Sequence, residues 1–383
     1  MTTKSLERMR ESVPFLRWLA ESRFAKKQRE EGIADLMFGN PQEMPLPGYV
    51  GALTAQIAPR DKAWFAYKLS EPGSTEVVAR SLAQRTGLEW DPSDVHMTNG
   101  GFAAIAVALR TLCEPGDEVV FLSPPWFFYE LLVLAAGAKP VRVPIEAPDF
   151  DLPIEAIARA IGPKTRAVLV NSPHNPSGRV WTKEDFTKLA KVLEAQPNPI
   201  WILSDEAYAK VVFDGRRAAS PAEVYPRTFV LYSYGKQLLA PGQRVGYAAV
   251  STSLPESERS ALREDVVMAQ CATGFAFPNA LLQHALAEIE GLSIDVAALQ
   301  RRRDRFVPAL RALGYETTNP EGTFYVLVRS PIDEDLLIDR LADEDVFVLP
   351  GKIVELPGFI RVSLTANDGM IEKAIAAFAK VRG

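Results

Sequence analysis

Ser233-Tyr-Gly-Lys236-Gln-Leu-Leu-Ala-Pro-Gly-Gln-Arg244-Val-Gly246-Tyr247 is the stretch from which fold and function are best predicted. It places a serine hydroxyl, a lysine amine and an arginine guanidinium close together, with glycine and proline between them. A lysine forms a Schiff base with an aldehyde, whereas a hydroxyl and a guanidinium bind a phosphate. Pyridoxal phosphate carries both groups, so it fits the stretch. Ser-x-x-Lys also occurs by chance around solvated surface lysines, so the cofactor assignment depends on motifs elsewhere in the chain.

A second candidate for phosphate binding is the segment from residue 95 to residue 112. Val95 to Thr98 reads as a short strand, Asn99-Gly100-Gly101 as a turn, and Phe102 to Leu112 as an apolar helix. Such a turn points free backbone N–H groups and the positive end of a helix dipole at an anion. The backbone of Gly100, Gly101 and Phe102 is therefore a candidate phosphate site, although an ordinary strand-to-helix turn needs glycine as well.

The fold class follows from strand-like apolar runs that alternate with helical segments. Besides the strand at residue 95, runs occur at Glu118 to Leu122, Pro140 to Val143, Ala167 to Asn171, Pro199 to Ser204, Thr228 to Leu231 and Val245 to Val250. This pattern indicates an α/β fold whose large domain has a mostly parallel sheet covered by helices on both faces. Ligands of such sheets bind at the carboxyl ends of the strands.

Side chains that suit pyridoxal phosphate follow four of these runs. They lie in Ser123-Pro-Pro-Trp126, Asn171-Ser-Pro-His-Asn175-Pro-Ser-Gly178, Asp205-Glu-Ala-Tyr208 and the segment from Ser233 to Lys236. Because ligands of such sheets bind at the carboxyl ends of the strands, these segments are expected to contribute to one ligand site.

The two ends of the chain predict a smaller α+β domain. Residues 4 to 31 have the apolar spacing of amphipathic helices, interrupted at Pro14. Beyond Cys271, helical stretches are followed by short strands and a final helix that Asn367 is expected to cap. We predict an N-terminal arm over 1–45, a large cofactor-binding domain over 46–290, and a small domain over 291–383 that the arm completes.

Composition excludes several classes of function. A chain of 383 residues with 47% apolar side chains can bury a large core. Its net charge is −5, and its acidic and basic residues are interspersed along the sequence. Neither nucleic acid nor an anionic membrane is an expected partner, and no apolar run is long enough for a signal peptide or a membrane span. Cys113 and Cys271 lack the spacing of a metal site, so we expect no metal, two buried free thiols and a cytoplasmic location.

Together these residues resemble the fold-type I pyridoxal-phosphate aminotransferases of classes I and II, a group that includes bacterial aspartate and aromatic aminotransferases. The resemblance runs from about Asp35 to the C-terminus. Its motifs occur in the family's order: Tyr67, Asn99-Gly-Gly, Pro125-Trp126, Asn175-Pro-Ser-Gly178, Asp205-Glu-Ala-Tyr208, Ser233-Tyr-Gly-Lys236, Arg244-Val-Gly246, Gly322-Thr-Phe-Tyr325 and Arg361.

The resemblance implies catalytic roles for three residues. Lys236 would hold the cofactor as a Schiff base and then move a proton on the substrate. Asp205 would face the pyridine nitrogen and keep it protonated, so that the ring accepts electrons. Tyr208, together with Asn175, would hydrogen-bond the ring oxygen of the cofactor.

It also implies binding roles for residues along the whole chain. Those expected around the cofactor phosphate are Ser233, Arg244 and the backbone of Gly100, Gly101 and Phe102. Trp126 would stack on the pyridine ring, and Tyr67 would reach the phosphate from the second subunit of a homodimer. Arg361 would bind the substrate's α-carboxylate through a bidentate pair, Asn175 would contribute to the same site, and Gly39 lies in a loop that closes over the substrate.

Three other functions fit part of the pattern. Serine acyl-transferases of the β-lactamase type use Ser-x-x-Lys, but they also need Ser-Asp-Asn and Lys-Thr-Gly, which the chain lacks. An aminotransferase-like regulator would carry a helix-turn-helix domain ahead of the resemblance, and such a domain does not fit before Asp35. Lyases, decarboxylases, racemases and oxidases with the same cofactor site remain open.

The expected activity is transfer of an amino group between an L-amino acid and a 2-oxo acid by a ping-pong mechanism. Several family members that use dicarboxylic substrates have a basic residue right after the glycine pair, where this chain has Phe102. Trp126, Phe127 and Phe38 are the other candidates for the wall of the side-chain pocket. A substrate carboxylate would lose water there without gaining a cation, so we expect a neutral or aromatic amino donor.

Overall fold

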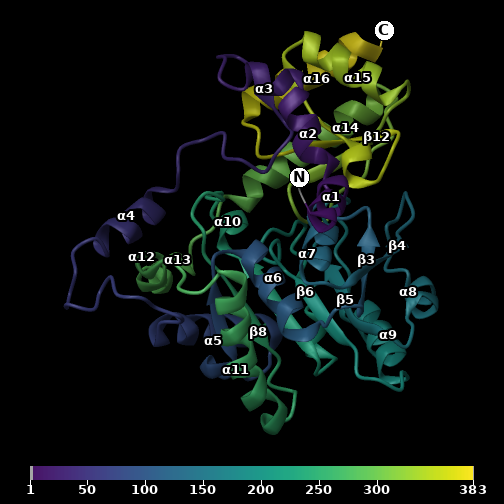
Figure 1. Cartoon of the computed structure of the whole chain (residues 1–383). Helices are drawn as coiled ribbons and strands as arrows, with labels where there is room; N and C mark the ends of the chain where they lie inside the picture. The colour runs from purple at the N-terminus through teal and green to yellow at the C-terminus, as the bar shows by residue number, and fades with distance from the viewer. Residues whose placement is uncertain (1–2, 383) are drawn as a thin grey trace.

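The large domain is built around a seven-stranded sheet (Figure 1). The structure is a computed structural model, and it describes residues 3–382. In sheet order the strands are β2 (Val95–Thr98), β8 (Gly246–Val250), β7 (Thr228–Ser233), β6 (Trp201–Asp205), β5 (Thr165–Asn171), β3 (Glu118–Ser123) and β4 (Lys139–Pro144). β8 runs antiparallel to both of its neighbours, and the other neighbouring pairs are parallel. The predicted α/β fold with a mostly parallel sheet is confirmed.

Helices cover both faces of this sheet because the side chains of each strand point alternately to the two sides. In β5, Leu169 packs toward one layer, whereas Val168 and Val170 pack toward the other. The first layer contains α6 (Gly101–Leu112), α7 (Tyr129–Ala135) and α11 (Glu256–Thr273). The opposite layer contains α5 (Pro72–Thr86), α8 (Ile154–Ala160), α9 (Lys183–Glu194), α12 (Ala280–His284) and α13 (Leu286–Ile289). The strands are apolar along their whole length because helices cover both faces of the sheet.

The smaller α+β domain lies above the large sheet in Figure 1. Its antiparallel sheet has the order β11 (Leu349–Pro350), β12 (Phe359–Ser363) and β9 (Tyr325–Arg329). Its helices are α14 (Val296–Ala312), α15 (Glu334–Asp343) and α16 (Asp368–Arg382), and they share one apolar core with the sheet. The expected cap of α16 is present, because the Asn367 side chain accepts the N–H of Met370 at 3.0 Å.

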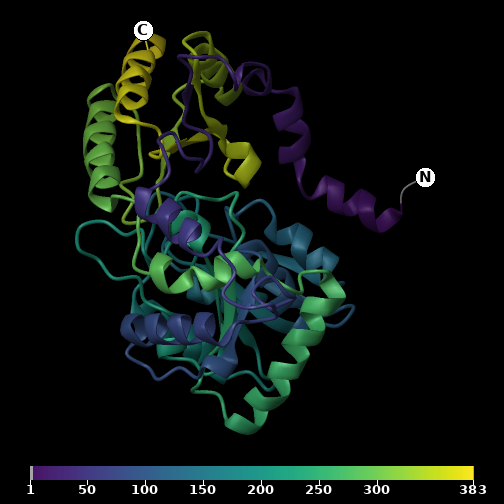
Figure 2. The same ribbon diagram turned by 90° about the vertical axis from the view of Figure 1, so that its left-hand side faces the viewer.

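The N-terminal arm completes the small domain, as the fold class predicted. β1 (Ala34–Asp35) pairs in parallel with β10 (Val346–Phe347). The helices α1 (Lys4–Glu11), α2 (Pro14–Glu21) and α3 (Arg23–Lys27) precede it, and Pro14 begins α2 as the interruption suggested. Figure 2 shows these helices extending from the small domain toward the side of the large one, where α1 contacts α7. α4 (Pro47–Ala55) packs on the large domain, and the domain boundaries at residues 45 and 290 stay predictions.

The structure differs from the sequence analysis in one helix and one cysteine. α11 was not predicted, and its buried residues Val266, Ala269 and Gln270 form a narrow stripe on one face. Cys271 lies off that stripe and is exposed, so the expectation of two buried thiols is wrong for this residue and right for Cys113. No helix among residues 3–382 has the length and apolar character needed to cross a bilayer.

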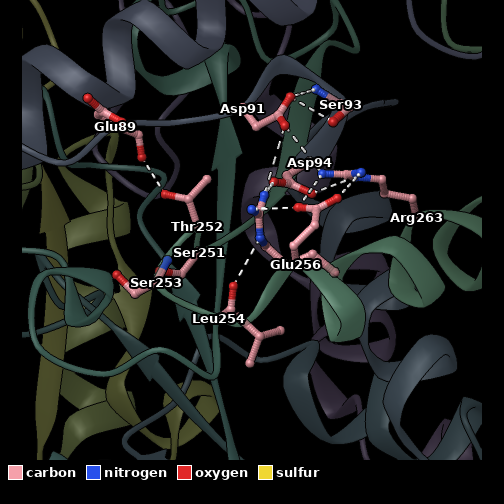
Figure 3. Close-up of polar contacts among 11 residues, drawn as sticks. Glu89, Asp91, Ser93, Asp94, Ser251, Thr252, Ser253, Leu254, Glu256 and Arg263 are labelled. Carbon is pink, nitrogen blue, oxygen red and sulfur yellow. Dashed lines mark hydrogen bonds and ion pairs between the residues drawn. The ribbon is translucent and has the colours of Figure 1, made fainter.

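Charged side chains attach α11 to the edge of the large sheet (Figure 3). The fully buried carboxylate of Asp94, just before β2, accepts from Arg263 at 2.8 Å and also pairs with Arg259. Glu256 pairs with both arginines on the helix side. A buried carboxylate needs such partners, and this network joins α11 to the segment that leads into β2.

Candidate active site

Most of the predicted site residues line one pocket at the carboxyl ends of β5, β6 and β7. Those that line it are Gly101, Phe102, Trp126, Asn175, Asp205, Tyr208, Ser233, Lys236 and Arg244. The three strands are consecutive in the sheet and parallel, so the residues that follow them meet at the same edge. Ile105, Asn171, Ala207, Gly235 and Pro241 also line the pocket and were not predicted.

Asp205 is a buried carboxylate at the end of β6, with 8% of its surface exposed. Its Oδ2 accepts the Tyr129 hydroxyl at 2.6 Å, and its Oδ1 accepts the N–H of Ala207 at 3.2 Å. Burial raises the pKa of the Asp205 carboxyl, and the hydrogen bond from Tyr129 acts in the opposite direction. No ion pair with Asp205 exists within residues 3–382. The site therefore has room for a cationic partner, and a protonated pyridine nitrogen is one.

An anion-binding cradle lies beside it at the start of α6. Gly100 has φ 85°, and a Cβ there would lie 2.7 Å from Nη2 of Arg244. The side chain of Ser233 packs against Gly101, where a Cβ would lie 3.2 Å from Cβ of Ser233. The side chain of Arg244 is exposed in the single chain and donates to the carbonyl of Pro241 at 2.7 Å, and partial desolvation lowers the pKa of its guanidinium. Among the residues described, it has no carboxylate partner, so a phosphate on the helix N-terminus would neutralise it.

Lys236 and Tyr208 lie between the cradle and the small domain. Lys236 belongs to the short helix α10 (Tyr234–Gln237), and its Nζ is 5.8 Å from the ring centroid of Tyr208 and 5.9 Å from that of Phe324. Burial raises the pKa of the Tyr208 phenol well above its usual value, and its hydroxyl is a hydrogen-bond partner of Tyr325. The amine can therefore meet an aldehyde while Tyr208 stays a neutral donor.

Arg361 presents a buried guanidinium from β12 of the small domain. It is 2% exposed, and its two terminal nitrogens donate to Oδ1 of Asn175 and to the carbonyl of Met37, each at 3.0 Å. The guanidinium stacks 3.9 Å from the ring centroid of Tyr325, and its Nε has no hydrogen-bond partner within the described part of the chain. Burial lowers the pKa of Arg361. A carboxylate is the ligand that this charge lacks.

Gly39 follows Met37 and lies where no side chain fits. A Cβ on Gly39 would be 2.3 Å from the Phe324 ring and 3.1 Å from the Tyr325 hydroxyl. The loop that was predicted to close over the substrate thus passes directly over the aromatic residues next to Arg361.

Tyr67 does not reach the pocket of its own chain. It is 87% exposed, and its ring lies 5.0 Å from that of Phe277 in a separate surface hollow. The role of Tyr67 on a second subunit stays a prediction.

Two residues with clear contacts to the site were missed as site residues. Tyr129 holds Asp205 from α7, and Tyr325 contacts both Tyr208 and Arg361. Tyr129 stands three residues after Trp126, and Tyr325 ends the Gly322-Thr-Phe-Tyr325 motif. A polar group within each motif was the available signal, but only the folded sheet shows which partner it meets.

Comparison with known proteins agrees with this geometry. The family described as aminotransferase class I and II matches residues 71–378. An aspartate/prephenate aminotransferase of Thermus thermophilus is 32% identical over 371 residues, which cover 94% of each chain. The crystal structure of an aminotransferase from Eubacterium rectale has a TM-score of 0.86 at 27% identity and covers 100% of this chain and 95% of that one. The structure of Thermus thermophilus aspartate aminotransferase with maleate has a TM-score of 0.84 at 27% identity, covering 100% of this chain and 99% of that one. The chain belongs to the class I and II aminotransferases, and it is a transaminase.

Proposed function

We propose that this transaminase uses pyridoxal phosphate to move an amino group between a neutral or aromatic L-amino acid and a 2-oxo acid by a ping-pong mechanism. The observation that carries the proposal is the buried carboxylate of Asp205, which has no ion pair among the described residues and lines the same pocket as Lys236. When bound, the cofactor supplies an aldehyde for the amine and a ring that accepts electrons. The neighbouring cradle of Arg244, Ser233 and the α6 N-terminus suits its phosphate.

Each residue of the pocket has a task that its surroundings support. Lys236 would hold the cofactor's aldehyde and would move the proton at the substrate's Cα. Asp205, held by Tyr129, would keep a proton on the pyridine nitrogen. Tyr208 and Asn175 would donate to the ring oxygen, and Trp126 would pack on the ring. All of these residues except Tyr129 line the pocket.

The substrate's α-carboxylate is assigned to Arg361, and the Gly39 loop covers it. Asn175 orients Arg361, because its Oδ1 accepts one guanidinium N–H at 3.0 Å. Two planar N–H groups then bind the two carboxylate oxygens in a bidentate pair, and this excludes water from the reacting carbon.

The amino-donor preference rests on the aromatic wall next to the pocket. Phe102 packs against Trp126 and Phe128, with ring centroids 5.5 and 5.4 Å apart. Lys236 and Arg244 are the cations that line the pocket, and both already have tasks on the cofactor. A second substrate carboxylate would lose its hydration there at a cost of about 2–5 kcal/mol. A neutral or aromatic side chain of the substrate carries no charge, so it does not pay this desolvation cost.

The expected result is a higher kcat/KM for phenylalanine and leucine than for glutamate and aspartate, each measured with a 2-oxo acid acceptor. Phe102→Lys should raise kcat/KM for aspartate about tenfold, since it adds the missing cation at the aromatic wall. Aspartate preferred by tenfold over every neutral donor in the wild-type enzyme would contradict the proposed preference. Continuous product formation without any 2-oxo acid would contradict transamination itself, because lyases, decarboxylases, racemases and oxidases need no such acceptor.

We also propose a homodimer in which Tyr67 serves the partner's pocket. A surface hollow lined by the exposed side chains of Phe65, Tyr67 and Phe277 supports it. Exposed clusters of large apolar side chains are typical of protein–protein interfaces.

Mixing two inactive or impaired variants tests this arrangement. A dimer of one Tyr67→Phe subunit and one Arg361→Ala subunit contains one intact site if Tyr67 acts across the interface. Its activity should therefore exceed that of either parent dimer. A fully active monomer near 42.2 kDa in a sedimentation run would refute the proposal.

A further inference from the structure

The turn after α13 is bound to the helix that carries Lys236. Glu290 directly follows α13, and its side chain is only 15% exposed. The Tyr234 hydroxyl, two residues before Lys236, donates to Oε2 of Glu290 at 2.5 Å. On the other side of Lys236, Nε2 of Gln237 donates to the carbonyl of Glu290 at 3.0 Å.

Gln237 strengthens the same attachment from its buried position. Its Oε1 accepts the Tyr232 hydroxyl at 2.8 Å, and its carbonyl accepts the N–H of Ile294 at 2.9 Å. Its Nε2 also donates to the carbonyl of Leu292. Tyr234 and Gln237, on either side of Lys236 in α10, are therefore held by the segment from residue 290 to residue 294.

The carboxylate of Glu290 also reaches the turn that carries Tyr208. Nζ of Lys210, two residues after Tyr208, pairs with Oε1 of Glu290 and donates to its carbonyl at 3.2 Å. The Ser81 hydroxyl from α5 donates to the same Oε1. Glu290 thus joins α5, the Tyr208 turn and α10 through one nearly buried charge.

These contacts matter because α10 is short. A helix of four residues cannot hold its own geometry, so its side-chain attachments fix its position. Lys236 must reach the cofactor aldehyde and then the substrate's Cα, and an error of about 1 Å in such a group can cost about a hundredfold in rate. Neither Glu290 nor Lys210 lines the pocket, so neither can act on the substrate directly.

We propose that Glu290 is a positioning residue, whose carboxylate fixes the helix of Lys236 to the turn of Tyr208. The inference rests on the proposed roles of Lys236 and Tyr208 toward the cofactor. Glu290 does not take part in proton transfer. Instead, it fixes the positions of the Lys236 and Tyr208 side chains during proton transfer.

Glu290→Gln and its matched control Glu288→Gln test the inference in the cofactor-loaded enzyme. Glu288 lies on the neighbouring α13 and accepts from Gln56 at 3.0 Å, away from α10. In Glu290→Gln we expect kcat to fall about tenfold while KM for the amino donor stays within about threefold, because Arg361 is untouched. The midpoint of the pH titration of the bound cofactor's absorbance should move down by about 0.5 pH units, since Lys210 loses its counter-charge. Glu288→Gln should change neither quantity.

Tyr234→Phe provides a second variant that keeps the packing and removes only the hydrogen bond from the Tyr234 hydroxyl to the Glu290 carboxylate. We expect its kcat to fall about threefold with KM unchanged. If Glu290→Gln does not fold, Tyr234→Phe decides the question. Folded variants with wild-type kcat and titration midpoint, whatever their unfolding temperature, would overturn the proposal. Absence of a titrating cofactor band in the wild-type enzyme would instead refute the proposed function.

Discussion

Lys236→Ala is expected to abolish transamination while the protein still folds and still binds pyridoxal phosphate without a covalent bond. The amine is the group in the pocket that can form a Schiff base and then move a proton at the substrate's Cα, so its loss removes both steps. We expect kcat to fall by at least about 1,000-fold. The cradle of Arg244, Ser233 and the α6 N-terminus does not involve Lys236, so the phosphate keeps its contacts.

Steady-state kinetics measure the loss of transamination, and a titration with pyridoxal phosphate measures whether the variant still binds the cofactor. Lys183→Ala is the control, since Lys183 has 58% of its side chain exposed at the start of α9 and lies outside the pocket. Transamination at the wild-type rate in Lys236→Ala would refute the assignment of the pocket.

Asp205→Ala is expected to lower kcat by at least about 100-fold. Without the carboxylate, nothing holds the proton on the pyridine nitrogen, and an unprotonated ring is a poor electron acceptor. Tyr129→Phe retains the charge and removes the hydrogen bond of 2.6 Å, so its loss should be about tenfold or less. A loss of less than about tenfold in Asp205→Ala would contradict the role of this residue.

The large domain was predictable because its signals are local. Runs such as the one from Glu118 to Leu122 are continuous apolar segments of strand length, and the structure places β3 at Glu118–Ser123. The helix after Gly101 also begins where the glycine turn indicated. Residues at the carboxyl ends of neighbouring parallel strands meet by geometry, which explains why Asn175, Asp205 and Lys236 could be predicted to share a pocket.

What the sequence could not supply are contacts between distant segments. Tyr129 and Asp205 are 76 residues apart, and Glu290 reaches Lys210 across 80. No local period encodes such pairs. α11 was missed because only Val266, Ala269 and Gln270 of its residues are buried, so its amphipathic pattern is weak. The exposure of Cys271 follows from that same narrow stripe.

The α+β class of the small domain could be predicted from the sequence, but the pairing of its short strands and the contacts of Arg361 could not. The short strand β10 (Val346–Phe347) carries little signal of its own, and it is recognised as a strand because it pairs with β1. Arg361 was located through a family motif, whereas its contact with Asn175 depends on how the two domains meet and its contact with Met37 on how the N-terminal arm packs. The dimer role of Tyr67 depends on a second chain and stays a prediction.

The most direct test of the account follows the absorbance of the bound cofactor through the two half-reactions. Adding phenylalanine alone to the purified, cofactor-loaded enzyme should replace the band of the lysine-bound aldehyde form with that of the amine form. Removing the amino acid and adding a 2-oxo acid should restore the first band, with one 2-oxo acid formed and one consumed per site. An absorbance that never converts with any amino acid, or that converts and cannot be restored by any 2-oxo acid, would contradict the account.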